Sequence, residues 1–463
     1  MANFIRERFA QLLRRRHGGV IVFLLLFVGV ATTTRLALIA HSGPAISWDF
    51  SLLAALAWGL VFDLGTGLLW ALPLTLILTM LPAGFFRRSW VRGLSYVALF
   101  AVFYLLLFGA VAEWMFWDEF NVRFNFIAVD YLVYTTEVIA NIRESYPMPA
   151  IFVGIGLVAA GGTALWLRTG LLQRWLAGAD EGWRRRYTAA AGWLVATLVM
   201  GVALDSQRLP AFANNYNREA AKNGLWSLVA AFRNNQLDYD QFYSTLPIDD
   251  AFRMVHDEFT MHGAAPKSPM ARDTLRFAPA PRTGPELRPN VIQITVESLS
   301  ADFVTGFNHA SRLTPNLGAL AQKSLVFEKF YATGTRTDRG IEALTLALPP
   351  TPGRSLVKRP RNENLFTLGS VFRSRGYDTA FIYGGYGYFD NMNYFFRHNG
   401  YRVIDRSAVT AEDITFANAW GACDEDVFRW TIREADTAHA AGKPFHFFVM
   451  TTSNHRPYTY PDG

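Results

Sequence analysis

The chain has 463 residues, of which 51% are hydrophobic and 18% are charged, with a formal net charge of +6. This length allows two or three domains, and the hydrophobic content indicates a membrane protein. The basic excess does not indicate nucleic-acid binding, because much of it lies in short loops between apolar runs. The single cysteine, Cys423, excludes an internal disulfide framework, and the acidic residues after it disfavour a thiolate, so we expect it to be structural.

Five apolar runs within the first 205 residues are long enough to cross a hydrocarbon core of about 30 Å as helices. We predict these spans at about residues 19–41, 51–82, 93–116, 149–168 and 188–205. The first run is too long for a signal peptide and lacks a good small-residue cleavage site, so it is predicted to stay as an anchor. The second run contains Asp63 between two glycines, and could be one span or two.

The distribution of arginines favours a single second span and predicts the orientation. With five spans, one side of the membrane receives three basic segments, whose arginines are Arg6, Arg8, Arg14, Arg15, Arg16, then Arg87, Arg88, Arg92, then Arg168, Arg174, Arg184, Arg185 and Arg186. Basic loops face the cytoplasm. The N-terminus is therefore predicted to be cytoplasmic, with everything after about residue 206 outside.

Two ionisable residues, Arg35 and Asp63, fall inside predicted spans. Such residues are candidates for a functional role, but pairing with each other or snorkelling is the simpler interpretation, and we favour it. In the outside loop between the third and fourth spans, residues 129–134 mix aromatic and acidic side chains and are predicted to lie along the membrane surface.

Residues 206–289 are predicted to connect the spans to a C-terminal domain. An amphipathic helical pattern over residues 214–243 indicates a connector helix that packs on that domain, and four prolines mark a linker: Pro279, Pro281, Pro285 and Pro289. The domain then begins with a buried parallel strand over residues 290–296.

Apolar strand candidates over residues 378–383 and 445–451 alternate with helix-like stretches over 314–324 and 364–375. This alternation predicts an α/β domain over residues 290–463, with a mostly parallel sheet that carries helices on both faces. In such sheets the functional residues collect beyond the carboxyl ends of the strands.

Three places in this domain could carry chemistry. Glu297 directly follows the first strand, where it could ligate a hard divalent metal or serve as an ordinary turn acid. The hydroxyl-rich turn over residues 333–340 precedes an apolar helix, so it could bind phosphate and supply a nucleophile, or be a plain capped turn. His455 follows the last strand and could donate to a phosphate, ligate metal or bond to backbone.

Taken together, these motifs resemble the lipoteichoic acid synthase family of phosphoglycerol transferases, in the alkaline phosphatase and sulfatase superfamily. Members have five membrane helices and an extracellular sulfatase-like domain, and the resemblance covers nearly the whole chain. The segments that carry it are Val296-Glu297-Ser298, Leu313-Thr314-Pro315-Asn316-Leu317, Gly334-Thr335-Arg336-Thr337 and Thr452-Ser453-Asn454-His455.

The resemblance implies that Glu297 and Thr337 ligate a divalent ion, usually manganese, and that Thr337 is the nucleophile. Thr337 is preferred to Thr335 because related phosphoethanolamine transferases place their threonine last in a similar turn. His455 matches the substrate-binding histidine of the family. Arg336 and Asp390 complete the predicted substrate-binding set.

The chain departs from the family pattern in three respects. An Asp-His doublet that completes the metal site in the family lies downstream of the region matching His455, so we expect the sequence, which stops at Gly463, to be a fragment. The His-Gly-Asp and Trp/Arg positions of the substrate pocket appear here as residues 383–385 and as Asp390 and Met392, which leaves the glycerol phosphate substrate open. No formylglycine signature is present, which favours phosphoryl transfer over sulfate ester hydrolysis.

The sequence therefore predicts a metal-dependent phosphoglycerol transferase outside a bacterial cytoplasmic membrane. Its donor would be a membrane phospholipid such as phosphatidylglycerol, its acceptor an envelope glycan or lipid, and its intermediate a phosphothreonine at Thr337. The alternatives are a phosphoethanolamine transferase, against which the single cysteine counts, a sulfatase-type ester hydrolase, or an inactive membrane-anchored binding protein.

Overall fold

The computed structural model describes residues 11–13, 15–86, 88–133, 135–178, 181–205, 209–234, 245–261, 284–308, 310–456 and 458–461. Several residues of the predictions above lie outside these ranges, namely Arg6, Arg8, Arg14, Arg87, Tyr134, residues 235–244 of the connector, Pro279 and Pro281. The chain divides into two compact units: the membrane unit, Met1–Val133 with Tyr146–Asn235, and the C-terminal unit, Tyr134–Ser145 with Gln236–Gly463.

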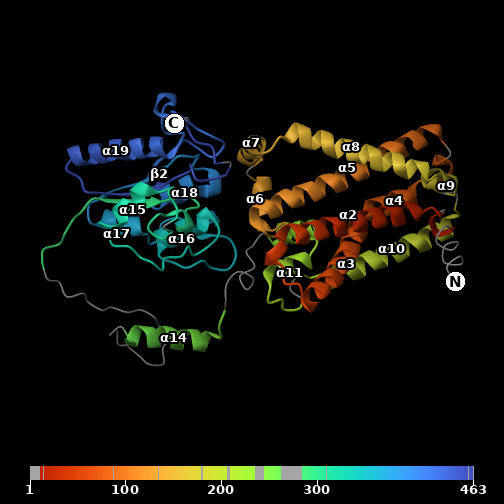
Figure 1. Ribbon diagram of the computed structural model, residues 1–463, viewed down its shortest axis with the longest axis horizontal. Coiled ribbons are helices and arrows are strands. Elements are labelled where there is room, and N and C mark those ends of the chain that lie inside the picture. The colour runs from red at the N-terminus through yellow and green to blue at the C-terminus, as the bar shows by residue number, and fades with distance from the viewer. Residues whose placement is uncertain are drawn as a thin grey trace. The chain divides into compact units, whose positions relative to one another are not determined.

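The membrane unit is helical (Figure 1). Its described α-helices are α2 Gly18–Ser42, α3 Phe50–Trp70, α4 Leu72–Met80, α5 Ser89–Phe120, α6 Phe126–Val133, α8 Met148–Arg168, α9 Leu171–Gly178, α10 Trp183–Ala203, α11 Asn215–Ala220 and α12 Gly224–Asn234. Five described stretches are long and apolar enough to cross a membrane: Gly18–Ala45, Phe50–Met80, Ser89–Phe120, Met148–Arg168 and Trp183–Ala203. The predicted five-helix layout is thus confirmed.

The second span is one apolar run with a break near its end. Helix α3 ends at Trp70 and α4 begins at Leu72, with a proline in the first turn of α4. Pro73 has no backbone N–H to continue the helical hydrogen bonds, so the helix is interrupted there. Asp63 lies inside α3, where the glycines beside it leave the helix unbroken.

Helix starts and ends gather at one end of the membrane unit around a single carbonyl. The guanidinium groups of Arg16 and Arg186 both donate to the Leu81 carbonyl, the latter over 2.9 Å. The Trp175 indole donates to the Arg16 carbonyl over 2.8 Å. The start of α2, the end of α4, α9 and the start of α10 therefore meet there, as expected if successive spans run in opposite directions.

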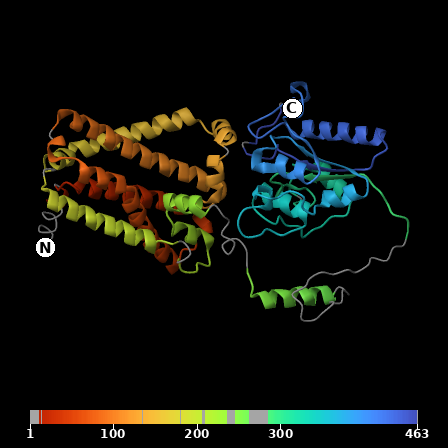
Figure 2. The ribbon, with the colours of Figure 1, turned by 180° about the vertical axis from the view of Figure 1, so that it is seen from behind.

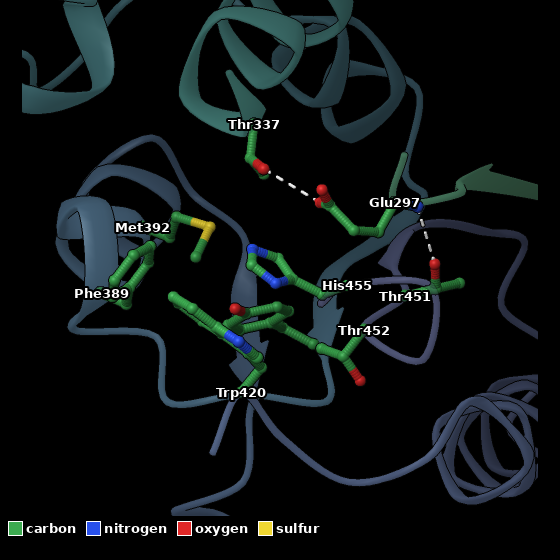
Figure 3. Close-up of a pocket in the computed structure, with 9 residues that line it drawn as sticks. Glu297, Thr337, Phe389, Met392, Trp420, Thr451, Thr452 and His455 are labelled. Carbon is green, nitrogen blue, oxygen red and sulfur yellow. Dashed lines mark hydrogen bonds between the residues drawn. The ribbon is translucent and has the colours of Figure 1, made fainter. Parts of the chain in front are cut away.

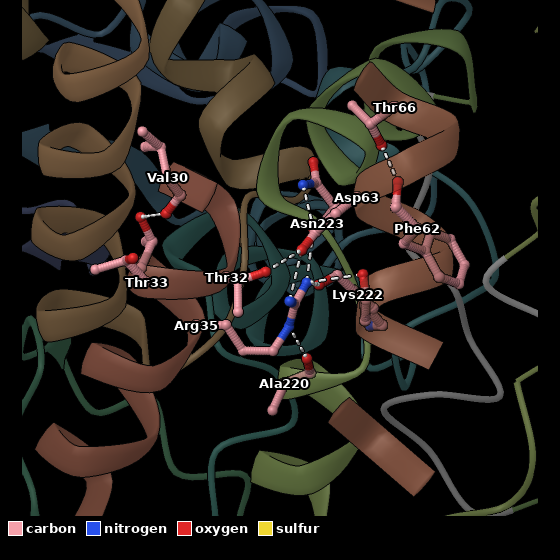
Figure 4. A network of polar contacts seen from close by, with 12 residues as sticks. Val30, Thr32, Thr33, Arg35, Phe62, Asp63, Thr66, Ala220, Lys222 and Asn223 are labelled. Atoms are coloured by element: carbon pink, nitrogen blue, oxygen red, sulfur yellow. Dashed lines mark hydrogen bonds and ion pairs between the residues drawn. The ribbon is translucent and has the colours of Figure 1, made fainter. Parts of the chain in front are cut away.

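Arg35 and Asp63 form a buried ion pair between α2 and α3 (Figure 4). The two guanidinium NH groups reach the two carboxylate oxygens over 2.6 and 2.7 Å, and both side chains are almost fully excluded from solvent. Asn223 donates to the same carboxylate over 2.8 Å, and Arg35 donates to the Ala220 carbonyl over 2.8 Å. This bidentate geometry is the strongest form of such a contact, and the structure gives these residues the pairing role favoured from the sequence.

The connector after the fifth span packs differently from the sequence prediction. Helices α11 and α12 belong to the membrane unit, where α11 contacts α2 and α3 and α12 contacts α6 and α3. The prediction that this segment packs on the C-terminal domain is therefore wrong for its described part. Polar contacts as well as apolar packing hold this segment on the spans. Arg35 donates to the carbonyls of Ala220 and Lys222, and Asn223 donates to the carboxylate of Asp63.

The C-terminal unit contains helix α7 (Thr135–Ser145) and a four-stranded parallel sheet in the order β1-β4-β2-β3 (Figures 1 and 2). The strands are β1 Val291–Thr295, β2 Asp378–Tyr383, β3 Arg402–Ile404 and β4 Phe445–Met450. The helices are α14 Ile248–Met261, α15 Pro315–Ala321, α16 Thr337–Leu346, α17 Leu368–Ser374, α18 Met392–His398 and α19 Asp424–Ala440.

Both faces of strands β2 and β4 are covered by helices. Successive side chains of a strand point to opposite faces, so Phe381 and Phe448 pack with residues of α16 and α18, whereas Ile382 and Phe447 pack with residues of α19. Figure 1 shows α19 on one side of the sheet and α16 and α17 on the other. The predicted α/β class with helices on both faces is confirmed.

Strand β1 is less buried than predicted. It lies at one edge of the sheet and pairs with β4. Ile292 and Ile294 remain 44% and 48% exposed, so the prediction of a buried strand is wrong for the described residues. The sequence pattern also gave no sign of the three-residue strand β3, which is too short to show a periodicity.

Candidate functional site

A pocket lies beyond the carboxyl ends of β1, β2 and β4 (Figure 3). Its lining joins residues from distant parts of the C-terminal unit: Glu297, Thr337, Tyr383, Phe389, Met392, Trp420, Thr451, Thr452 and His455. Parallel strands bring their carboxyl ends to one edge of a sheet. This is why residues 154 positions apart, such as Glu297 and Thr451, come into contact.

The backbone around Glu297 is fixed by residues that follow β4. The Glu297 N–H donates to Thr451 Oγ1 over 2.9 Å, and Asn454 Nδ2 donates to the Glu297 carbonyl over 3.0 Å. The carboxylate itself accepts from two hydroxyls: Ser298 Oγ over 2.8 Å and Thr337 Oγ1 over 3.0 Å, one on each oxygen. Among the residues that the structure describes, no lysine or arginine forms a salt bridge with this carboxylate.

Thr337 is the first residue of α16, and its hydroxyl points toward Glu297 in Figure 3. The first amides of a helix have no intrahelical acceptor and carry a partial positive charge, which favours an anion nearby. Thr335 is exposed and is not among the residues that line the pocket. Of the two threonines in the turn, the structure thus brings Thr337 to the pocket.

His455 faces the same pocket with a defined tautomer. Its Nδ1 lies 2.8 Å from the Arg456 carbonyl, and because a carbonyl can only accept, Nδ1 carries the proton. In the neutral ring Nε2 is therefore an acceptor, and it donates to a phosphate only when the ring is protonated. The turn that holds His455 is anchored to α19, since Asp424 accepts from the backbone N–H groups of Thr452 and Ser453.

Arg336 and Asp390, the other predicted substrate-binding residues, are not among the pocket-lining residues. Arg336 is the N-cap of α16, directly before Thr337. Asp390 is buried and pairs with Lys358 over 2.8 Å, and Lys358 also pairs with Asp338 over 3.2 Å. Lys358 therefore links Asp390 to Asp338 in the first turn of α16. Asp390 thus helps to hold the start of this helix in place without lining the pocket.

Burial controls the protonation of two groups around the pocket. Burial, reinforced by the charge of Glu297, raises the pKa of the Tyr383 hydroxyl far above its ordinary value, so Tyr383 is a neutral wall residue. Burial also raises the pKa of Asp390, while the nearby Lys358 ammonium opposes that shift. Cys423, which precedes α19, is likewise buried, and burial raises the pKa of its thiol, in agreement with the structural role expected from the sequence.

The donor set partly fits a divalent metal. Glu297 and Thr337 place a carboxylate and a hydroxyl oxygen together, and hard cations such as Mn²⁺ or Mg²⁺ prefer oxygen ligands. Such ions take about six ligands, however, and the described residues contain no cluster of three or more His, Cys, Asp and Glu side chains. The two oxygens can therefore form only part of a metal site.

Comparison with known proteins defines the class of the C-terminal unit. Residues 289–463 match the family model of the Sulfatase family. A Sulfatase domain therefore occupies this part of the chain, and the expected membership of the sulfatase and alkaline phosphatase superfamily is confirmed for it.

Two similar sequences are named as phosphoglycerol transferase I. The protein from Salmonella arizonae is 25% identical over 188 residues, and that from Escherichia fergusonii is 27% identical over 190 residues. Each match covers 38% of this chain and 24% of the relative. The aligned part thus spans about a quarter of the length of these relatives.

Solved structures that are similar to this chain include a protein of the alkaline phosphatase superfamily from Vibrio parahaemolyticus. It is 36% identical, with 49% of this chain and 54% of that chain covered and a TM-score of 0.42. Lipooligosaccharide phosphoethanolamine transferase A from Neisseria meningitidis, an integral membrane protein, is 13% identical, with 95% and 69% covered and a TM-score of 0.47.

The sequence prediction brought Glu297, Thr337 and His455 together, but it missed the aromatic side of the pocket. Phe389 and Trp420 meet edge to face with ring centroids 5.5 Å apart, and Trp420 lies 3.9 Å from the His455 ring. Trp420 belongs to an irregular segment between β3 and α19, so no strand or helix pattern marks it. Thr451 and Thr452 could have been found, since they directly follow the predicted last strand.

Proposed function

We propose that this chain is a membrane-anchored phosphotransferase that moves a phosphoglycerol head group from a phospholipid to an envelope glycan or lipid. The observation that carries the proposal is the hydrogen bond from Thr337 Oγ1 to Glu297, at a helix start and inside a pocket that also contains His455. The similar sequences that are named phosphoglycerol transferase I support the choice of head group.

In the first step, Thr337 Oγ1 would attack the phosphorus of the donor phosphodiester. The bond to the diacylglycerol oxygen would break, diacylglycerol would leave after taking up a proton, and phosphoglycerol would remain as an ester of Thr337. The proton of the Thr337 hydroxyl is already directed at Glu297. In the second step, a hydroxyl of the acceptor would attack the same phosphorus and release Thr337.

A divalent ion, for which manganese is our proposal, would be held by Glu297 and Thr337 with further ligands. When bound, such an ion would lower the pKa of the hydroxyl and polarise the phosphoryl group. The residues of this chain would supply orientation, because bound reactants held in line gain much of the rate of an intramolecular reaction.

The anchor would keep the pocket close to its lipid donor. The arginine-rich segments place the N-terminus in the cytoplasm in this proposal, so an odd number of spans leaves the C-terminal unit outside, facing the outer leaflet. A head group of the cytoplasmic membrane would then lie within reach without extraction of the lipid into water.

Intact-mass analysis after incubation with manganese and phosphatidylglycerol tests the nucleophile and the donor together. We expect a phosphoglycerol-sized adduct on the wild-type chain, and loss of the adduct together with an activity loss of at least about a thousandfold in Thr337→Ala. Thr335→Ala is the matched control, because its hydroxyl is two residues away and outside the pocket lining, and it should keep the adduct.

The outcomes separate the candidate reactions. An adduct only with phosphatidylethanolamine would change the head group to phosphoethanolamine. Release of free glycerol phosphate without any acceptor would show that water resolves the intermediate and that the protein is a hydrolase. No adduct with any common phospholipid, in a chain shown to bind manganese, would rule out the lipid-donor mechanism.

A further inference from the structure

The aromatic side of the pocket comes from two segments that are far apart in the sequence. Phe389 follows β2 and begins a single 3-10 turn, and Trp420 lies in the irregular segment before α19. The two rings meet edge to face, and the Trp420 ring lies beside His455 (Figure 3). Because neither residue belongs to a strand or an α-helix, other parts of the fold must hold their backbone in place.

The two segments are hydrogen-bonded to each other. The Ala422 N–H donates to the Gly384 carbonyl over 2.9 Å. Arg406 donates its backbone N–H to the Gly385 carbonyl over 3.0 Å and its guanidinium to the Asn418 carbonyl over 3.3 Å. A displacement of one segment is therefore passed on to the other.

Helix α7, which belongs to the same compact unit, contacts both segments. The Tyr388 hydroxyl donates to Glu137 Oε1, and the Ala419 N–H donates to Glu144 Oε2 over 3.2 Å. Each of the two contacted residues directly precedes the aromatic residue of its segment. The helix therefore holds both segments next to the rings that line the pocket.

The spacing of residues on α7 explains how one short helix reaches both segments. Glu137, Asn141 and Glu144 are separated by four and three positions, so they share one face of the helix. Glu137 and Asn141 are only 8% and 3% exposed. Burial of a carboxylate is unfavourable unless a donor compensates it, and the Tyr388 hydroxyl is such a donor.

The part of the chain that supplies α7 is the membrane anchor. The helix lies between α5 and α8, which are two of the stretches long enough to cross a membrane. A hydrophilic helix of 11 residues is marginal in water by itself, so its packing on the C-terminal unit is what keeps it folded. The pocket thus depends on a loop between two spans as well as on the Sulfatase domain.

We propose that Glu137 of α7 is a positioning residue, which acts through Tyr388 and fixes the aromatic side of the pocket around the substrate. Glu144 holds the second segment in the same way. The proposal rests on the proposed function for its effect on catalysis, whereas the effect on the pocket itself requires no reaction. It makes the loop between the third and fourth spans a part of the catalytic unit.

Glu137→Ala in the complete membrane-embedded chain removes the acceptor. Small displacements of positioned groups lower the rate strongly, so we expect kcat/KM for diacylglycerol release from phosphatidylglycerol vesicles with manganese to fall about tenfold. Glu137→Gln keeps an oxygen that can accept from Tyr388 and should stay within about threefold of wild type. Tyr388→Phe removes the donor and should match Glu137→Ala, and the double variant should lose no more than either, because one interaction is lost in all three.

Amide hydrogen exchange, followed by mass spectrometry, shows whether the loss is one of position. In Glu137→Ala, peptides over residues 385–391 and 416–421 should exchange at least about threefold faster, while β2 and β4 exchange as in wild type. Faster exchange throughout the C-terminal unit would show that Glu137 contributes only to general stability and would overturn the proposal.

Tyr394→Phe is the matched control. Tyr394 on α18 donates to Glu363, which is also a tyrosine–glutamate hydrogen bond, but neither residue lines the pocket or belongs to α7. This variant should leave both kcat/KM and the exchange of the two segments unchanged. If it had the same effect as Tyr388→Phe, the role of α7 would not be specific, and the proposal would be wrong.

The two measurements fail independently. Unchanged exchange of both segments in Glu137→Ala would overturn the proposal whether or not the chain turns over lipid. Faster exchange with kcat/KM within about twofold of wild type would overturn it as well, because catalysis would then not depend on the position of the segments. If wild type released no diacylglycerol, the proposed function would fail, and the exchange of the two segments alone would decide whether α7 positions the pocket.

Discussion

Two carboxylates of this protein are placed in opposite ways, one in each unit. Asp63 in the membrane unit is fully buried and accepts hydrogen bonds from Arg35 and Asn223, with Thr32 at 3.4 Å. Glu297 in the C-terminal unit accepts only hydroxyl hydrogen bonds among the described contacts, from Ser298 and Thr337.

The difference shows which carboxylate is available for a ligand. The charge of Asp63 is neutralised by a bidentate guanidinium, and its oxygens are occupied, so it stabilises the attachment of the connector to the spans. Glu297 has no lysine or arginine partner among the described residues and lies in a pocket, where a carboxylate can hold a metal ion or receive a proton. In this comparison, the carboxylate that indicates function is therefore the one whose partners leave it without a counter-charge.

Of the substitutions at these two carboxylates, that of Glu297 should have the larger effect, and the effect is on activity. Glu297→Gln keeps the shape and can still accept from one hydroxyl, but it removes the negative charge beside Thr337. We expect the rate of diacylglycerol release to fall about 10²–10³-fold, comparable to the loss of other electrostatic contributions to catalysis. The rate is measured with phosphatidylglycerol vesicles and manganese.

The same variant should barely change the folded state, because Glu297 has no ion pair with any residue that the structure describes. Its unfolding temperature in detergent should stay within about 2 °C of wild type. Asp390→Asn is the contrasting variant, since Asp390 is buried against Lys358, and it should reduce stability as well as activity. A Glu297→Gln protein with full activity would remove the basis for distinguishing the two carboxylates.

The second effect is on stability and concerns Asp63. Asp63→Leu leaves the guanidinium of Arg35 buried without its counter-charge, which typically costs about 3–5 kcal/mol. We expect the detergent-solubilised chain to aggregate about 10 °C lower than wild type. The double variant Arg35→Leu with Asp63→Leu removes both charges and should recover more than half of this loss.

An exposed ion pair provides the control for this cycle. Glu434 pairs with Arg402 over 3.0 Å, but the arginine is 48% exposed. Glu434→Gln should therefore change stability by less than about 1 kcal/mol. Additive effects of the Arg35→Leu and Asp63→Leu substitutions on stability would show that the two residues are not coupled. The conclusion that Arg35 neutralises the charge of Asp63, on which the comparison with Glu297 depends, would then be wrong.

The sequence predicted most of the architecture because its signals are long or regular. Each predicted apolar run overlaps a helix in the structure, and the strand predicted over residues 378–383 has the bounds of β2. The burial of β1 could not be predicted, since an apolar strand looks the same in sequence at the edge and at the centre of a sheet. The packing of α11 and α12 depends on individual polar contacts, which hydrophobic periodicity does not predict.

The candidate site was predicted as far as it follows strand ends and helix starts. Glu297, Thr337 and His455 lie in one pocket because parallel strands align their carboxyl ends. The position of Trp420 in the pocket lining could not be foreseen, because it lies in an irregular segment that no strand or helix pattern marks. Arg336 and Asp390 are adjacent to the site residues in sequence, yet adjacency does not determine which side chains line a pocket.

The smallest effect we predict concerns His446, a buried ionisable side chain whose hydrogen-bond partner is neutral. His446 on β4 is fully buried, stacks on Phe372 with centroids 4.4 Å apart, and has one neutral partner, Gln293, at 3.2 Å. Burial lowers the pKa of His446 to about 4, from 6.5. Between these values the unfolded chain binds a proton that the folded chain does not, so stability is lost as the pH falls from 6.5 towards 4.

The loss contributed by His446 should approach, but not exceed, about 3 kcal/mol by pH 4. His446→Gln should reduce the pH dependence of the urea concentration at which half of the C-terminal unit is unfolded. This midpoint is measured by protection from protease. The exposed control His439→Gln should show the same pH dependence as wild type. An unchanged slope in His446→Gln would mean that His446 is protonated in the folded state. The fold would then tolerate a buried charge on His446 beside a single neutral partner as well as it tolerates the charge of Asp63 beside Arg35 and Asn223. The number and charge of its partners would in that case no longer distinguish a structural ionisable group from a functional one.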